Sequence, residues 1–194
     1  MKILLTFFVL LFSSSVVAED ISDLKIDGIG LYENLSNHYS EIIIKKEVKK
    51  YIDKYAKFGL DHSFIELSFW GKSDYEALAY FIKPEDPEYI IWGINGKKRY
   101  ININKCFDEK DNIEKQISYV FPDTKKSYYN GPHNLDPSGK STVESTFILL
   151  QSGINIELTC YDFDRSMQKQ GENWDHFAIY IDSKELLLWL PLPN

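Results

Sequence analysis

The fold of this chain is decided by the stretch TVESTFILLQSGINIELTCYD, residues 142–162. Two runs rich in β-branched and aromatic residues, 142–151 and 154–162, flank the dipeptide Ser152-Gly153. Short runs of this kind on either side of a glycine-containing turn are typical of a β-hairpin. The stretch therefore predicts two antiparallel strands joined by a tight turn.

The second run carries one of the two cysteines on its apolar face. Cys160 alternates with Ile154, Ile156 and Leu158, so these four side chains share one side of the strand. Cys106 is the other cysteine, and it lies on the apolar side of a predicted helix if that helix extends back so far. A single pair in an oxidising compartment is most simply a disulfide, worth roughly 4 kcal/mol for a loop of this length. A metal or redox pair would be expected to show C-x-x-C spacing.

Two longer helices are expected before this hairpin. The first has apolar residues at helical spacing and a stop at Gly59, and the second has Asp108 as its cap and ends at Pro122. The apolar positions of the first are Ile44, Val48, Tyr51, Ile52 and Tyr55, and those of the second are Ile113, Ile117, Val120 and Phe121.

Further strands are predicted at 63–70 and 75–83, and Phe177, Ile179 and Ile181 mark a late strand before a short helix at 183–190. Asn95-Gly96 is the strongest turn signal, because both residues tolerate the positive φ of a type I′ turn, and it predicts a hairpin of 89–94 and 97–103. The element order indicates an α+β fold: antiparallel sheets built from hairpins, two main helices and one disulfide.

The N-terminus is typical of an export signal. Lys2 precedes an apolar run, and Val16 and Ala18 place small residues before a cut at Glu19. We expect residues 1–18 to be the signal peptide and 19–194 to be a single α+β domain, exported to the periplasm or secreted, with no transmembrane segment after cleavage. A weak repeat of helix plus meander would divide that domain near residue 104.

Composition excludes one large class of partner. The formal net charge is −7, which does not suit general nucleic-acid binding, since phosphate must be neutralised by basic residues. Six lysines line the polar side of the first helix, an arrangement that can contact anionic lipid but is more simply a solvated face. They are Lys45, Lys46, Lys49, Lys50, Lys54 and Lys57.

The segment 125–141 has no hydrophobic period and is predicted to be a long loop, the preferred place for a binding surface. Its aromatic, polar and basic residues Tyr128, Tyr129, His133 and Lys140 are the candidate binding residues. Ser138 to Thr142 resembles the end of a phosphate-binding loop, but Asn134 stands where that motif needs glycine, so no nucleotide is expected.

Catalytic and metal motifs are weak. Asp162, Asp164, Asp175 and His176 could converge near the end of the hairpin, yet they lack a metal-binding spacing, and acids at strand ends commonly cap turns. We therefore expect no metal and no cofactor. A hydrolase using loop acids with His133 or His176 stays open, although neither G-x-S-x-G nor H-E-x-x-H occurs.

Several short pieces together resemble a group of uncharacterised small exported proteins from marine alphaproteobacteria that has no assigned activity. The pieces are IDGIGL at 26–31, DYE at 74–76, YIIWGI at 89–94, Cys106, residues 136–141 and CYDF at 160–163. The resemblance implies paired cysteines and an exported domain, and it carries over no site residues.

Three functions follow as hypotheses. The favoured one is a non-enzymatic periplasmic binding or envelope-accessory protein with a protein or small-molecule partner. The alternatives are a hydrolase-type enzyme and a secreted inhibitor or interaction module. A concave pocket with convergent polar groups would favour the enzyme.

Overall fold

The structure, a computed structural model, describes residues 21, 24–55, 62–70, 74–168 and 173–190. The expected export signal, its cut before Glu19 and the predicted helix stop at Gly59 lie outside the described residues.

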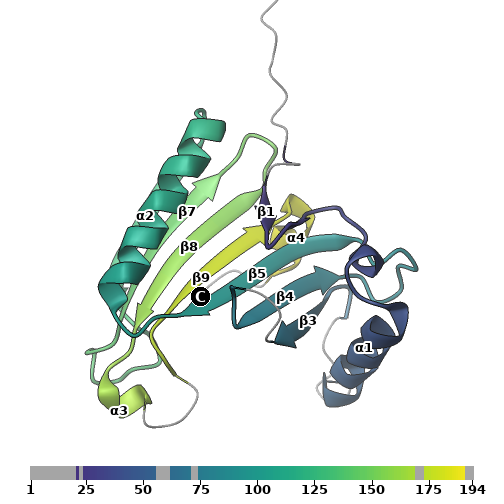
Figure 1. Cartoon of the computed structure of the whole chain (residues 1–194), viewed down its shortest axis with the longest axis horizontal. Coiled ribbons are helices and arrows are strands. Elements are labelled where there is room, and N and C mark those ends of the chain that lie inside the picture. The colour runs from purple at the N-terminus through teal and green to yellow at the C-terminus, as the bar shows by residue number, and fades with distance from the viewer. Residues whose placement is uncertain (1–20, 22–23, 56–61, 71–73, 169–172, 191–194) are drawn as a thin grey trace, which may run out of the picture.

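Seven strands form one antiparallel sheet in the order β3-β4-β5-β9-β8-β7-β6 (Figure 1). They are β3 (Ile65–Trp70), β4 (Ala77–Ile82), β5 (Ile91–Arg99), β6 (Lys125–Pro132), β7 (Thr142–Leu149), β8 (Asn155–Asp162) and β9 (His176–Asp182). The helices are α1 (Glu41–Tyr55), α2 (Ile103–Val120), α3 (Arg165–Gln168) and α4 (Lys184–Trp189). A small hairpin, β1 (Lys25–Ile26) with β2 (Ile29–Gly30), and the 3-10 turn η2 (Leu35–Asn37) precede α1. The predicted α+β class is confirmed.

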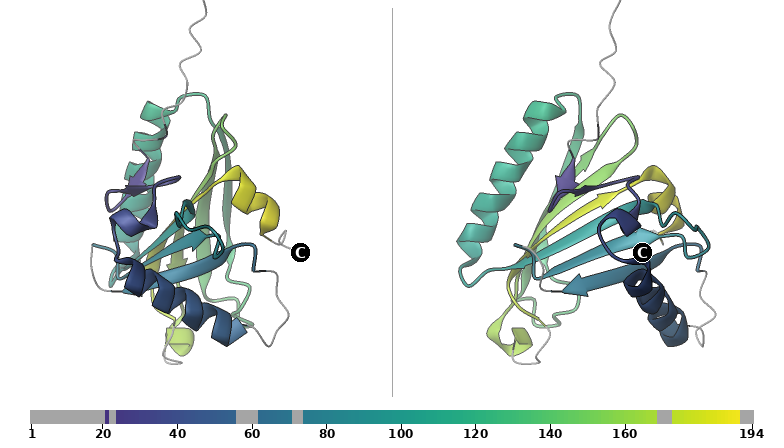
Figure 2. Two further views of the ribbon diagram at one scale, coloured as in Figure 1. Left: turned by 90° about the vertical axis from the view of Figure 1, so that its right-hand side faces the viewer. Right: turned by 45° about the vertical axis from the view of Figure 1, so that its right-hand side comes forward.

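The helices cover the two faces of the sheet unequally. In the left view of Figure 2, α1, α2 and the β1–β2 hairpin lie on one side of the sheet and α4 lies on the other. We call the side that carries α4 the outer face. None of the helices in the described part of the chain is long and apolar enough to cross a membrane.

The main core lies between the sheet and the two long helices. Among its fully buried side chains are Ile44 of α1, Tyr80 of β4 and Phe177 of β9. Burying an aliphatic or aromatic side chain of this size contributes about 1.5–3 kcal/mol. A smaller cluster of Phe64, Phe81 and Leu186 holds α4 against the outer face.

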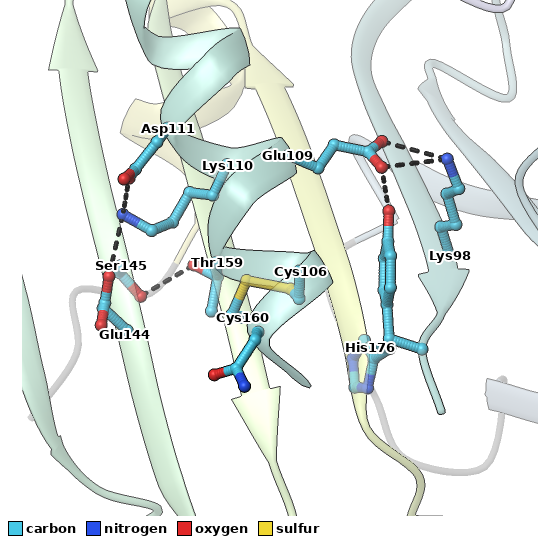
Figure 3. Close-up of a disulfide and its surroundings, with 12 residues drawn as sticks. Lys98, Cys106, Glu109, Lys110, Asp111, Glu144, Ser145, Thr159, Cys160 and His176 are labelled. Atoms are coloured by element: carbon cyan, nitrogen blue, oxygen red, sulfur yellow. Dashed lines mark hydrogen bonds and ion pairs between the residues drawn. A yellow bond between two sulfur atoms is a disulfide. The ribbon is translucent and has the colours of Figure 1, made fainter. Parts of the chain in front are cut away.

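The predicted hairpin and disulfide are both confirmed. β7 and β8 pair antiparallel from Thr142↔Asp162 to Leu149↔Asn155, and Gly153 in the turn has a φ of +88°. Cys106 of α2 and Cys160 of β8 form the disulfide, with Cα atoms 6.0 Å apart (Figure 3). Both cysteines are buried, so the bond fastens α2 to the sheet from inside the core.

The predicted hairpin at Asn95-Gly96 is wrong. β5 runs straight through both residues and pairs with β4 on one side and β9 on the other. Gly96 is not among the glycines with positive φ. Two complete hydrogen-bonded neighbours outweigh the local turn preference, because a turn there would leave both partner strands unpaired.

The predicted loop at 125–141 is wrong for its first half, which is strand β6. All but one of the β6 residues are exposed, so the strand has no buried face and hence no alternating pattern to reveal it. It pairs with β7 as an edge strand. Only residues 133–141 form a loop.

The second helix begins earlier than predicted. Asn102, not Asp108, is the N-cap of α2, and its side chain accepts a hydrogen bond from Asn104 N at 3.0 Å. The earlier start takes Cys106 into the helix and onto its buried face. At the far end of the chain, α4 has the expected extent and Ser183 as its cap.

Candidate functional site

Two of the four predicted binding residues point to opposite faces of β6. The Tyr128 hydroxyl donates a hydrogen bond to Oε1 of Glu114 on α2 at 3.0 Å. Its neighbour Tyr129 donates instead to the carbonyl of Pro132 at 3.1 Å. Adjacent residues of a strand alternate in direction, so the structure does not bring these tyrosines into one surface, and their binding role stays a prediction.

His133 and Lys140 lie at the two ends of the remaining loop. Nδ1 of His133 accepts a hydrogen bond from Leu135 N at 3.2 Å, and the ring lies 4.9 Å from that of Phe163. Lys140 is exposed. The histidine thus joins an aromatic cluster while the lysine faces solvent.

The loop between them is held by Asp136. Its carboxylate accepts hydrogen bonds from Ser141 Oγ at 2.7 Å, Ser141 N at 2.8 Å and Ser138 N at 2.9 Å. The bonds from Ser141 and Ser138 hold the pKa of Asp136 well below its usual range. The segment that resembles a phosphate-binding loop is therefore a turn closed by its own side chains before β7.

The acids near the hairpin end also cap turns. Oδ1 of Asp175 accepts from Phe163 N at 2.8 Å, and Oδ1 of Asp164 accepts from Ser166 N at 3.0 Å. Among residues 21, 24–55, 62–70, 74–168 and 173–190, no three His, Cys, Asp or Glu side chains are grouped to hold a metal ion.

His176 is a poor candidate for a general base. Its Nδ1 lies 2.7 Å from the Trp174 carbonyl, to which it donates a hydrogen bond, and its ring stacks on Tyr161 at 4.5 Å. Burial lowers the pKa of His176 to about 4. A catalytic base works best with a pKa near the working pH, so this ring is too weakly basic near neutrality.

A polar network lies on the outer face, between β7, β8 and β9. Side chains next to Cys160 along β8 point away from α2, because directions alternate. Thr159 Oγ1 donates to Glu157 Oε1 at 2.7 Å and shares a hydrogen bond with Ser145 Oγ, also at 2.7 Å (the latter is drawn in Figure 3). Burial raises the pKa of both Tyr161 and Tyr180, which lie on the same face.

Two carboxyl groups on this face have raised pKa values. Burial raises the pKa of Glu157, and burial together with the nearby charge of Glu157 raises the pKa of Asp182 to about 7. Such a pair could exchange protons with a substrate. Neither acid, however, is among the residues that line the hollows described next.

One hollow lies between α1 and the edge strand β3. It has a volume of about 270 Å³. One face of α1 forms one wall, and the exposed edge of β3 forms the other. The lining residues are Glu47, Lys50, Tyr51, Lys54 and Tyr55 from α1 and Glu66, Leu67, Ser68 and Trp70 from β3. Figures 1 and 2 both show α1 beside β3 at this end of the sheet.

A second hollow of about 300 Å³ lies on the outer face of the same strand. It shares Glu66, Ser68 and Trp70 with the first. Small residues, Ala77 and Ala79 of β4, help to line it. The other lining residues are Asn95, Lys97 and Tyr180. We refer to the first as the helix-side hollow and to the second as the outer hollow.

The β3 edge between these hollows has free backbone groups. β3 pairs with β4, and its residues make no other backbone–backbone hydrogen bond within the described part of the chain. In an antiparallel edge strand, every second residue directs its N–H and C=O outward. An edge of this kind can accept a further strand.

Sequence reasoning missed these residues. Tyr51 and Tyr55 were assigned to the core face of the first helix, and Glu66, Ser68 and Trp70 were simply the polar side of an alternating strand. One signal was present: Trp70 lies on that polar side and is 69% exposed. Tryptophan combines a large apolar ring with a polar N–H and is therefore enriched at interfaces.

A comparison of the chain with protein-family models, with curated proteins and with solved structures found no match.

Proposed function

We propose that this chain is an exported, non-enzymatic binding protein that takes an extended segment of a partner protein as an additional strand on β3. Strand addition to a sheet edge obtains affinity from main-chain hydrogen bonds and specificity from pockets for alternate side chains. The observation that carries the proposal is the edge of β3, which pairs with no second strand among the residues that the structure describes and lies directly beside a hollow walled by α1.

The opposite edge of the sheet is less suited to this role. β6 carries Lys125 and Lys126 at its start and Pro132 at its end. Exposed lysines and proline are the usual devices that keep an edge strand from pairing. β3 contains neither residue, so the two edges differ in the way expected if one of them pairs with a partner.

The hydrolase remains the second hypothesis and is less well supported. Its histidine and loop acids are engaged in caps and ring stacking. The carboxyl pair with raised pKa values, Glu157 and Asp182, does not line the helix-side or the outer hollow.

Export is part of the proposal. The N-terminal signal in the sequence supports it, and so does the disulfide between Cys106 and Cys160, since such bonds persist mainly in oxidising compartments. An interaction module that acts on an exported or surface partner is consistent with both features.

The test uses the oxidised full-length chain and a displayed library of random linear peptides. Peptides that are selected should protect the β3 amides from hydrogen exchange and leave the β6 amides unchanged. Each selected peptide is then made in two forms, one N-methylated at the odd positions and the other at the even positions. Only one of these two sets of N–H groups faces β3 in an added strand, so one form should lose binding while the other keeps it. Equal binding by both forms, or no selected peptide, would contradict strand addition.

A further inference from the structure

A third hollow lies on the outer face at the opposite end of the strand order from β3, between the edge strand β6 and α4. It has a volume of about 480 Å³, and we call it the corner hollow. Lys125 of β6 and Leu149 of β7 are directly opposite each other in the sheet, and Leu187 lines the hollow from α4. The other lining residues are Lys126, Ser127, Phe147 and Asn155.

Apolar side chains continue from the corner hollow onto the surface of α4. Leu149 is 42% exposed and Leu188 is 80% exposed. Leu187 and Leu188 share one side of α4 with Lys184, because residues three and four apart on a helix are neighbours. The left view of Figure 2 shows α4 projecting from the sheet. These leucines are therefore presented to any surface that meets this corner of the molecule.

Two lysines beside these leucines have no acidic partner. Neither Lys125 nor Lys184 makes an ion pair with another described residue. The Lys184 side chain lies over the turn between β7 and β8, since its Cδ is 3.1 Å from the position of a Cβ on Gly153. Lys126 differs from both, because its Nζ pairs with Glu114 of α2 at 3.0 Å. Two cations beside the leucines are thus free to contact a ligand.

The acids near this corner are directed elsewhere or only weakly charged. No acidic residue among those that the structure describes lines the corner hollow. Glu185 lies two residues from Leu187 and so faces another side of α4, where its charge acts on Tyr32. Asp123 is exposed and precedes β6. The two buried acids of the outer face have pKa values raised by burial, which reduces their negative charge.

From this combination we propose that the corner hollow and α4 form a surface that binds an anionic lipid membrane. The side chains of Leu149, Leu187 and Leu188 enter the boundary between head groups and acyl chains. Lys125 and Lys184 contact the lipid phosphates. Binding of this kind gains from buried apolar area and from the attraction of basic residues to anionic lipid.

The residue types favour a membrane over a protein partner. Protein interfaces are depleted in lysine, and leucine is under-represented among their hot spots. Elements that lie on membranes commonly combine the two. The net charge of −7 opposes an anionic surface, but charges further away than about 8 Å are largely screened at physiological salt. The local lysines therefore decide the sign of the interaction.

This surface is separate from the β3 edge. β3 and β6 are the two ends of the strand order, and the corner hollow shares no lining residue with the helix-side or the outer hollow. Membrane binding and strand addition can therefore occur together, and either can fail without the other.

Cosedimentation with vesicles tests the proposal on the oxidised chain in its exported form, with the N-terminus determined by mass spectrometry. One set of vesicles contains equal parts of phosphatidylglycerol and phosphatidylcholine, and the other contains phosphatidylcholine alone. We expect binding to the anionic set to be at least about tenfold tighter. Equal binding to both sets, or no binding to the anionic set, would overturn the inference.

A matched pair of leucine variants locates the apolar contact. Leu188→Gln should weaken binding to the anionic vesicles by about tenfold. Leu135→Gln removes an equally exposed type of leucine from the loop at the other end of β6 and β7 and should leave the affinity unchanged. An environment-sensitive fluorophore on Leu188→Cys should shift to shorter wavelength on these vesicles, whereas the same label on Leu135→Cys should not. Both natural cysteines are in the disulfide, so each variant has a single thiol to label.

A matched pair of charge variants locates the electrostatic contact. Lys125→Glu with Lys184→Glu should weaken binding to the anionic vesicles by at least about tenfold. Lys46→Glu with Lys49→Glu makes the same charge change on exposed positions of α1, the other basic surface of the chain, and should have a much smaller effect. Circular dichroism verifies that each variant is folded.

The controls decide against the proposal in two ways. If Leu135→Gln or the α1 pair weakens binding as much as the corner variants do, the membrane contact lies elsewhere and the inference is overturned. If sedimentation shows that the chain dimerises and that the corner variants are monomeric, a second copy covers this surface and the inference is likewise overturned.

Discussion

At the scale of single residues, Gly96 shows how close packing selects an amino acid. A Cβ at this position would lie 2.8 Å from Cδ1 of Tyr75 and 3.2 Å from Cγ2 of Ile179. Ile179 belongs to the main core and Tyr75 packs against it, so neighbouring side chains restrain both. The glycine is needed for space and not for a positive φ.

The substitution Gly96→Ala should therefore lower the free energy of unfolding by about 1–3 kcal/mol, the usual range for overpacking a core. Urea denaturation measures it. Gly131→Ala on β6 is the control, because its Cβ would meet only the ring of Tyr129, which is exposed and can turn. If Gly131→Ala lowered the free energy of unfolding as much as Gly96→Ala does, close packing around Gly96 could not be the reason for the loss.

Asp182 is a carboxyl group held in an environment that disfavours its ionised form. Its pKa in the folded protein is raised by burial and by Glu157 from the ordinary 3.8 to about 7. Between these values the folded state retains a proton that the unfolded state has released. This residue therefore destabilises the fold increasingly as the pH rises from about 4 to about 7.

Asp182→Asn removes that penalty. The stability of the variant relative to the natural chain should increase with pH across the same window, by up to about 4 kcal/mol. Chemical denaturation at a series of pH values tests this. A difference that stays constant from pH 4 to pH 8 would show that Asp182 is not proton-coupled to folding.

At the scale of elements, the start of α2 determines where the disulfide and the polar contacts of this helix lie. Because Asn102 caps it, Cys106 falls in the second turn and faces β8. On either side of the disulfide, Glu109 pairs with Lys98 at 3.0 Å and Lys110 pairs with Glu144 at 3.0 Å (Figure 3). Lys110 is buried and also pairs with Asp111 at 3.3 Å, so loss of both acidic partners would leave an unpaired charge in the interior.

Asn102→Ala should destabilise the chain by about 1 kcal/mol, the usual value of an N-cap. Asp108→Ala, at the position that the sequence pattern had favoured, should change stability by less than about 0.5 kcal/mol, since Asp108 is an exposed residue inside the helix. Thermal melting of both variants distinguishes the two cap assignments. The reverse order of effects would place the helix start at 108.

At the scale of the whole molecule, the disulfide closes a long segment of chain. It joins residues 54 apart in the sequence and connects α2 to β8, so it constrains the unfolded chain over everything from the second helix to the central hairpin. β6 and β7 both lie within this loop.

Replacing both cysteines, Cys106→Ala with Cys160→Ala, should lower the free energy of unfolding by roughly 4 kcal/mol. The natural chain under reducing conditions is the companion measurement and should lose a similar amount. If neither condition changes the urea midpoint, the bond contributes nothing to folding stability.

What the sequence alone determined are the elements with strong local signals. The α1 helix, the β3–β4 and β7–β8 hairpins, α4 and the cysteine pair each have a period, a turn residue or a shared face that can be read without knowing the neighbours. The α+β class follows from their order.

Only the tertiary structure decided the rest. Asn95-Gly96 has a local preference for a turn, but it lies within a strand because β4 and β9 pair with it on either side. β6 has no buried face, so no alternating pattern marks it as a strand. The candidate site was equally hidden. Its walls come from α1, β3, β4, β5 and β9, and which strand lies at the edge depends on the pairing of all seven. The order of strands beyond the local hairpins is a long-range property of the sheet, and no local pattern encodes it.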